Sequence, residues 1–239
     1  MDIEHNRTLA DLEQVLPSLE GYLRPEGAPF NTMPSLQGSS LIGDIEDRVR
    51  YISDSVALTV QRNRNAVAKA IEVFRDWMIQ GTVVRVLGAG RARLAASVPA
   101  NRLAHGGARV FVQDDIIPMP HSIKGGGILA ASASGKTRTL LQNLAIAKSK
   151  GTSLNVVGIA AHDANEFKSY CDLFIGIHEP QIAQRPLQAL ADTGEYVIGE
   201  LLDAIVVAGG RLAGFDETTW RLGHEDLGPT GPYDMERPR

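Results

Sequence analysis

The sequence predicts an α/β fold: a three-layer α-β-α sandwich with a buried, five-stranded parallel sheet of the flavodoxin-like kind and an N-terminal helical extension. Two observations predict it. Short β-rich runs recur through the middle of the chain, and segments with helical character separate the first four of them. These runs do not alternate strictly between apolar and polar residues, which indicates strands that helices cover on both faces.

The N-terminal part is expected to lie outside this sandwich. Residues 8–22 have the pattern of a short helix, whereas residues 24–40 are rich in Pro, Gly and Ser and are typical of a loop. We therefore expect an N-terminal arm over residues 1–42, the α/β domain over residues 43–213, and a polar C-terminal tail over residues 214–239.

A long helical pattern opens the domain. Apolar residues recur at intervals of three and four from Asp44 to Met78, as they do along one face of a helix. Asp44 is a plausible N-cap, and Gly81 stands where a glycine often follows a helix end. The polar cluster over residues 61–65 (QRNRN) predicts a break into two helices.

The sheet and its helices follow in alternation. Helical segments are predicted at about 92–106 and 137–150, and a last long helix over residues 186–212. The predicted strands are 83–87, 109–112, 127–131, 155–160 and 173–177.

Composition narrows the classes of function. The 239 residues carry a net charge of −4, so bulk charge gives no case for binding nucleic acid. No apolar run reaches the ~18 residues of a transmembrane helix, and the N-terminus lacks the order of a signal peptide. Cys171 is the only cysteine, which excludes an internal disulfide. We expect a cytoplasmic protein without a membrane partner.

Two loops carry the candidate ligand-binding residues. One follows the first strand and the other follows the third, so both lie at the edge of a parallel sheet where ligands bind. Small residues there allow close approach of the backbone, and each loop leads into a helix N-terminus that favours anions. The loops predict a phosphate cradle that needs neither metal nor lysine, formed by Gly88, Gly90, Arg91, Ser132, Ser134, Gly135 and Thr137.

Three other interpretations of these loops stay open at this point. Gly135, Lys136 and Thr137 match the end of a nucleotide-binding P-loop, but Ala130 stands in place of its first glycine. Gly88 and Gly90 match the start of a dinucleotide fingerprint, but Arg93 occupies the position of its third glycine. Both loops could also be tight turns that need glycine only for their geometry.

Four segments resemble the sugar isomerase (SIS) domain, and the closest pattern is that of the 6-phospho-3-hexuloisomerases. The resemblance covers residues 44–228. GAGRARLAASVPANRLAHGG resembles the family's GAGRSG turn and the helix after it, and SASGKT resembles S-G-S-G-E-T. GEYVIGELLDAIV resembles the helix that carries the family's glutamate, and HEDLG at 224–228 resembles its terminal H-A-N-L-E.

The resemblance implies a phosphosugar aldose–ketose isomerase that works through a cis-enediol, without a metal or other cofactor. It implies that Ser132, Ser134 and Thr137 bind the phosphate and that Glu195 is the base that moves the proton. It assigns ring opening to His224, so that the C-terminal tail contributes to the active site. It also implies a homodimer or homotetramer with active sites at subunit junctions.

Three residues depart from the family pattern. Ala92 replaces a serine, Lys136 replaces an acidic residue beside the phosphate loop, and Gly194 replaces the phenylalanine before the glutamate. These departures leave two alternatives open: a non-catalytic phosphosugar-binding regulatory protein, and a deglycase or lyase that acts on a phosphorylated sugar adduct.

Overall fold

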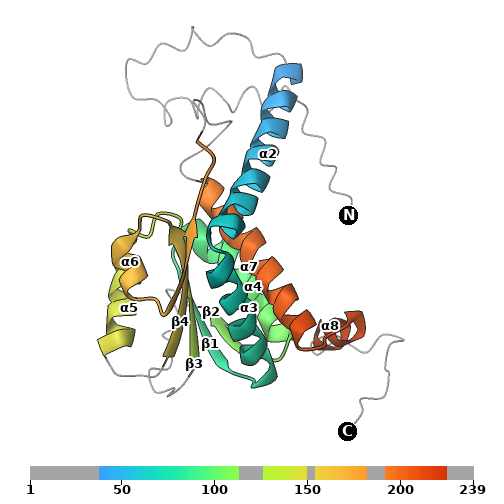
Figure 1. Ribbon diagram of the computed structural model, residues 1–239, viewed down its shortest axis with the longest axis vertical. Coiled ribbons are helices and arrows are strands. Elements are labelled where there is room, and N and C mark those ends of the chain that lie inside the picture. Colours follow the sequence, from blue (N-terminus) through green and yellow to red (C-terminus); the bar gives the residue numbers. More distant parts are fainter. Residues whose placement is uncertain (1–37, 113–125, 150–153, 182–191, 225–239) are drawn as a thin grey trace, which may run out of the picture. The chain divides into compact units, whose positions relative to one another are not determined.

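The computed structural model describes residues 38–112, 126–149, 154–181 and 192–224, and it confirms the predicted sheet (Figure 1). All strand pairs are parallel, and the order β2-β1-β3-β4-β5 is the flavodoxin-like one. The strands are β1 Val83–Gly88, β2 Arg109–Val112, β3 Gly126–Ala131, β4 Leu154–Ala161 and β5 Leu173–Ile177. The helix predicted at 8–22 lies outside the described residues.

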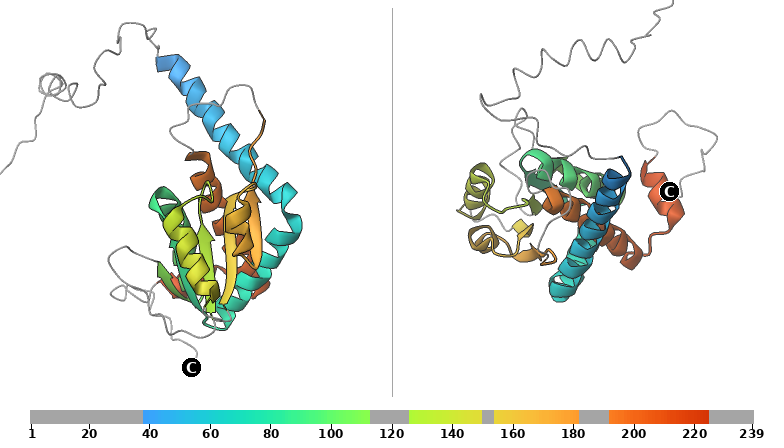
Figure 2. Two further views of the ribbon diagram at one scale, coloured as in Figure 1. Left: turned by 90° about the vertical axis from the view of Figure 1, so that its left-hand side faces the viewer. Right: turned by 90° about the horizontal axis from the view of Figure 1, so that it is seen from above.

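Helices form a layer on each face of this sheet (Figures 1 and 2). One layer consists of α3 Arg64–Ile79, α4 Gly90–His105 and α7 Asp192–Leu212. The other consists of α5 Arg138–Ser149 and the short α6 Asn165–Ser169. Each layer has its own apolar core against the sheet, which explains why the strands lack strict alternation.

The helical pattern before the sheet is divided as predicted. Helix α2 covers Gly38–Arg62, α3 follows from Arg64, and the break falls at Asn63 within the polar cluster. The prediction that Asp44 caps the first helix is wrong, because α2 begins six residues earlier, at Gly38. Extending an established helix costs little per residue, so even the Gly- and Ser-containing start is helical.

Asn63 explains why the break lies at this point. Its side-chain Nδ2 donates to the carbonyl of Gly176 at 2.8 Å, and its Oδ1 accepts from the amide of Gly176 at 3.0 Å. The side-chain amide thus pairs with the outer edge of β5 in the way that one residue of a further strand would. Nδ2 also donates to the carbonyl of Thr59, at 2.7 Å.

Within the predicted C-terminal tail, the structure has a helix that the sequence analysis does not predict. Helix α8 covers Glu217–His224. Oδ1 of Asp216 accepts from the amide and the hydroxyl of Thr219, both at 2.7 Å, and these hydrogen bonds hold the pKa of Asp216 below its usual value. Trp220 packs edge-on against Phe215. An N-cap aspartate and one aromatic anchor are enough to order a short helix against the domain.

Replacing Asn63 with Ala should lower the free energy of unfolding by about 2 kcal/mol, because both edge hydrogen bonds of Gly176 are lost together. Urea denaturation of the full chain measures the effect. Asn65→Ala is the matched control, since Asn65 is exposed in the same segment. Equal stability of the two variants would contradict the role given to Asn63.

Candidate functional site

The two candidate loops start side by side. Gly88 at the end of β1 pairs in register with Ala131 at the end of β3. A Cβ on Gly88 would lie 2.9 Å from Cα of Arg93, and Gly90 has a φ of +55°. Both glycines are therefore required by the turn itself, because α4 passes close to the strand end and the backbone enters the left-handed region.

The loop after β3 is held by its own hydroxyl groups. Oγ of the buried Ser132 accepts from the amide of Gly135 at 3.0 Å and lies 3.4 Å from Oγ1 of Thr137. Oγ of the exposed Ser134 accepts from the amide of Lys136 at 3.2 Å. Each serine hydroxyl uses its oxygen for the loop backbone, and its own proton can still be donated to an anion.

The shape of this loop suits an anion and does not match a P-loop. Thr137 directly precedes α5, and its carbonyl accepts from the amide of Leu141, so the loop lies at a helix N-terminus. Gly135 has a φ of +67°, and a Cβ there would overlap that of Ala164. Ala130, where a P-loop would begin, is a buried residue inside β3.

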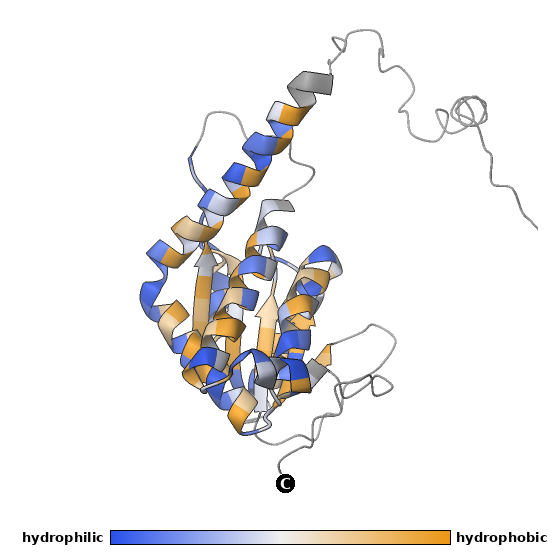
Figure 3. Cartoon of the chain, turned by 90° about the vertical axis from the view of Figure 1, so that its right-hand side faces the viewer, coloured by the Kyte–Doolittle hydropathy of each residue, from blue (hydrophilic) through white to orange (hydrophobic). Residues whose placement is uncertain are grey.

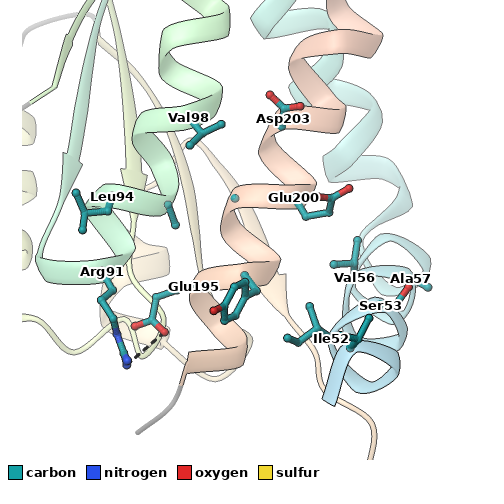
Figure 4. Close-up of a pocket in the computed structure, with 14 residues that line it drawn as sticks. Ile52, Ser53, Val56, Ala57, Arg91, Leu94, Val98, Glu195, Glu200 and Asp203 are labelled. Carbon is teal, nitrogen blue, oxygen red and sulfur yellow. Dashed lines mark ion pairs between the residues drawn. The ribbon is translucent and has the colours of Figure 1, made fainter. Parts of the chain in front are cut away.

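Glu195 lies in the first turns of α7, opposite the start of α4 (Figure 4). Its side chain is only 17% exposed, and its Oε2 is 3.6 Å from Nη2 of Arg91, which is 52% exposed. The pair combines a largely buried carboxylate, which can take up a proton, with an accessible cation, which can bind an anionic group.

Helix α7 connects Glu195 to the loop after β3. A Cβ on Gly194 would lie 2.8 Å from Cβ of Ala133, in the middle of that loop. A phenylalanine at 194 would therefore not fit while Ala133 keeps its place. The small residues Gly194 and Ala133 thus contact each other, and this contact brings the turn of α7 that carries Glu195 up to the loop.

A groove of about 870 Å³ extends from this ion pair between α2, α4 and α7 (Figure 4). Arg91 and Glu195 line it together with apolar side chains, among them Val49, Leu94 and Val98, all three of which are exposed. Figure 3 shows that apolar residues also recur along α2. Much of the groove is therefore apolar surface that the described part of the chain does not cover.

His224 is not brought to this site within one chain. It is the last residue of α8, and the neighbouring Gly223 lies against the carbonyl of His105, at the end of α4. Arg91 lies in the first turn of the same helix. Fourteen residues along α4 separate Arg91 from His105, about 21 Å at 1.5 Å per residue. The sequence predicts His224 in a polar C-terminal tail, outside any periodic helix; this is wrong, since α8 includes it.

The contacts of Arg102 and Cys171 indicate structural roles for both side chains. Nε of Arg102 lies 2.6 Å from Oδ1 of Asp203, so this second arginine joins α4 to α7. Burial, reinforced by the charge of Asp172, raises the pKa of Cys171 to about 12, so its thiol is not a nucleophile at neutral pH. Neither group belongs to the proposed cradle.

Sequence reasoning missed a polar cluster at the ends of β4 and β5. His162 and His178 each follow directly after a strand, and their rings stack with centroids 4.6 Å apart. The hydroxyl of Tyr51 donates to Oε2 of Glu179 at 2.9 Å beside them. Their position directly after predicted parallel strands could have identified them as candidates. The spacing of the histidines in the sequence says only that they form no metal-ligand motif.

In the segments that the structure describes, no group of three or more His, Cys, Asp or Glu side chains is arranged to hold a metal ion. No helix among the described residues is long and apolar enough to cross a membrane.

No protein-family model matches this chain, and no curated protein matches its sequence. Solved structures do match. An E. coli protein in complex with a sugar phosphate has a TM-score of 0.62 at 21% identity, over 79% of this chain and 100% of that one. A Methanococcus jannaschii protein with an inferred function of 3-hexulose-6-phosphate isomerase matches with a TM-score of 0.58 at 19% identity, over 75% of this chain and 98% of that one.

The sugar isomerase domain of an RpiR transcription factor from Sphaerobacter thermophilus matches with a TM-score of 0.51 at 16% identity, over 80% of this chain and 99% of that one. These similarities show that the chain has the sugar isomerase fold and confirm the resemblance at that level. At such identities, isomerases and a regulator share the fold, so the fold alone does not choose between them.

Gly194→Ala should lower the free energy of unfolding by about 1 kcal/mol, because the new Cβ overlaps Ala133. Adding Ala133→Gly should recover about the same amount, a coupling typical of residues in contact. Denaturation of the two single variants and the double variant measures it. Gly199→Ala on the same helix is the control, since its Cβ would meet nothing closer than 3.6 Å. Additive effects would show that the contact is not tight.

Proposed function

We propose that this protein is a phosphosugar aldose–ketose isomerase, similar to 6-phospho-3-hexuloisomerase, that acts through a cis-enediol. The observation that carries the proposal is the contact of Gly194 with Ala133, which places the helical turn of the largely buried Glu195 against a hydroxyl-rich loop at a helix N-terminus. A phosphate held on the loop leaves the sugar carbons within reach of α7.

Each part of the site has a role in this proposal. The hydroxyls of Ser132, Ser134 and Thr137 donate to the phosphate, whose charge the N-terminus of α5 favours. Glu195 removes a proton from the carbon beside the carbonyl and returns it to the neighbouring carbon. Arg91 lies opposite, where a cation can stabilise the negative oxygen of the enediolate.

A second function, phosphosugar sensing without catalysis, has one observation in its favour. The guanidinium of Arg91 already faces the carboxylate of Glu195. An ion pair with Arg91 engages the carboxylate that an isomerase needs for the proton transfer. A ligand anion that binds Arg91 would remove this effect in an isomerase, whereas a sensor would need only the binding.

We further propose that the protein self-associates through the groove between α2, α4 and α7. Val49 on α2 and Leu94 and Val98 on α4 are each more than half exposed. Both apolar surfaces belong to one chain, so a two-fold axis can pair α2 of each copy with α4 of the other. The groove ends at Arg91 and Glu195, and such an interface would therefore close the active site.

Glu195→Gln should reduce isomerisation by about 10²-fold or more while phosphosugar binding persists, because the amide keeps the shape but cannot take up a proton. Proton exchange between solvent and the sugar carbon, followed by NMR, is the direct measurement. Glu200→Gln is the control, since Glu200 is exposed on the same helix and lines the same groove.

Full activity of the Glu195→Gln variant would remove Glu195 from the mechanism. Binding of phosphosugars without any exchange in the wild-type protein would instead favour the sensor.

Val49→Glu should shift the protein towards the monomer, because it puts a charge into the apolar interface. Analytical ultracentrifugation at several concentrations measures the shift. Ile146→Glu on α5 is the control: Ile146 is also exposed, but it lies in the opposite helical layer. A wild-type monomer at all concentrations, or an equal effect of both variants, would contradict this interface.

A further inference from the structure

A second hollow, of about 500 Å³, lies at the carboxyl ends of β4 and β5. It shares Ala133 with the phosphate loop and has no lining residue in common with the groove beside Glu195. The same loop residue therefore contacts helix α7 through its Cβ and forms a wall of this hollow. Its polar side chains come from His162, Asp163, Glu179 and Gln181.

His162 is held so that one ring nitrogen remains an acceptor. Its Nδ1 lies 3.3 Å from the carbonyl oxygen of Ile177. A carbonyl can only accept, so this hydrogen bond needs a proton on Nδ1, and in the neutral form of the ring Nε2 is then the acceptor. Gly176 makes the position possible, because a Cβ there would lie 3.0 Å from Cα of His162.

His178 supports the ring of His162 by stacking on its face. The two imidazoles stack with an interplanar angle of 20°. Burial, the neighbouring His162 and the charge of Arg62 lower the pKa of His178, so its ring is neutral at pH 7. Its backbone is fixed as well, since its amide donates to Oγ1 of Thr59 at 3.0 Å and its carbonyl accepts from that hydroxyl at 3.2 Å.

Two of the other polar residues that line the hollow are acidic. Glu179 accepts from the hydroxyl of Tyr51, which holds the carboxylate in place, and Asp163 is exposed at the rim. The described lining contains no lysine or arginine. An imidazole acceptor and two carboxylates accept hydrogen bonds from hydroxyl groups, and they repel a phosphate.

We propose that this hollow receives a hydroxyl of the carbons next to the phosphate, with Nε2 of His162 accepting its hydrogen bond, while the carbonyl end of the sugar points towards Glu195. The inference rests on the proposed function, because it takes the phosphate to be on the neighbouring loop. The loop offers hydroxyl and amide donors to the phosphate, and the hollow offers acceptors to the hydroxyls. This division fixes the direction in which the sugar lies across Ala133.

Calorimetric titration of the full-length protein tests the proposal. The probes are D-arabinose 5-phosphate, D-fructose 6-phosphate and D-sedoheptulose 7-phosphate, with inorganic phosphate as the reference. His162→Phe keeps a stacking ring but removes the acceptor. It should lower the affinity for the tightest-binding sugar phosphate about ten-fold, which is the loss typical of one hydrogen bond of about 1.4 kcal/mol. The affinity for inorganic phosphate should stay within about two-fold of the wild type.

Glu179→Gln is a second variant in the same hollow and should act in the same direction. Asn165→Ala, an exposed change on α6 outside the hollow, is the control and should leave both affinities unchanged. Melting temperatures of all variants report whether each is folded.

The outcomes separate the two proposals. Unchanged sugar-phosphate affinity in both hollow variants overturns the proposal that the hollow binds the sugar, and it leaves the isomerase proposal standing. An equal loss for sugar phosphate and inorganic phosphate also overturns the hollow, since it would mean a disturbed phosphate loop. If the wild-type protein binds no sugar phosphate more tightly than inorganic phosphate, both proposals fail. A selective loss in the hollow variants, with an active Glu195→Gln variant, supports the hollow and contradicts the assigned base.

Discussion

The close approach of α7 to the loop after β3 is the constraint on which the candidate site depends. Gly194 and Ala133 leave no room for a larger pair of side chains, and this contact sets the depth at which Glu195 lies. Because the loop is also tied to β4, through the amide of Ala161 and the carbonyl of Ala133, the carboxylate is positioned by the sheet itself. A site built on strands and helices keeps its geometry better than one on free loops.

The loop lies between two hollows of opposite chemistry. On one side an apolar groove ends at Arg91 and Glu195, and on the other side a smaller hollow is lined by imidazole and carboxylate acceptors. An elongated ligand with one phosphate and several hydroxyls matches this sequence of environments. The apolar groove has no such match in the ligand, which is why we propose a second copy of the chain as its partner.

Several features of the site could be predicted because they depend on neighbouring residues. The glycines at 88, 90 and 135 and the hydroxyls at 132, 134 and 137 lie within two turns, each between a strand and a helix, and short spacing fixes such turns. The break near Asn63 was visible as a polar cluster. The edge pairing of Asn63 with Gly176 could not be predicted, because 113 residues separate the two along the chain.

The sequence by itself determined the five strands, the long helices, the parallel sheet and the two loops, because periodicity and turn chemistry are local; the short helices α6 and α8 were not predicted. Only the tertiary structure decided that α8 takes His224 to the far end of α4, that Arg102 pairs with Asp203, and that His162 stacks on His178. These depend on which strands lie side by side and where each helix ends. The physical reason is that packing joins residues far apart in the chain, and no local pattern records the distance between them.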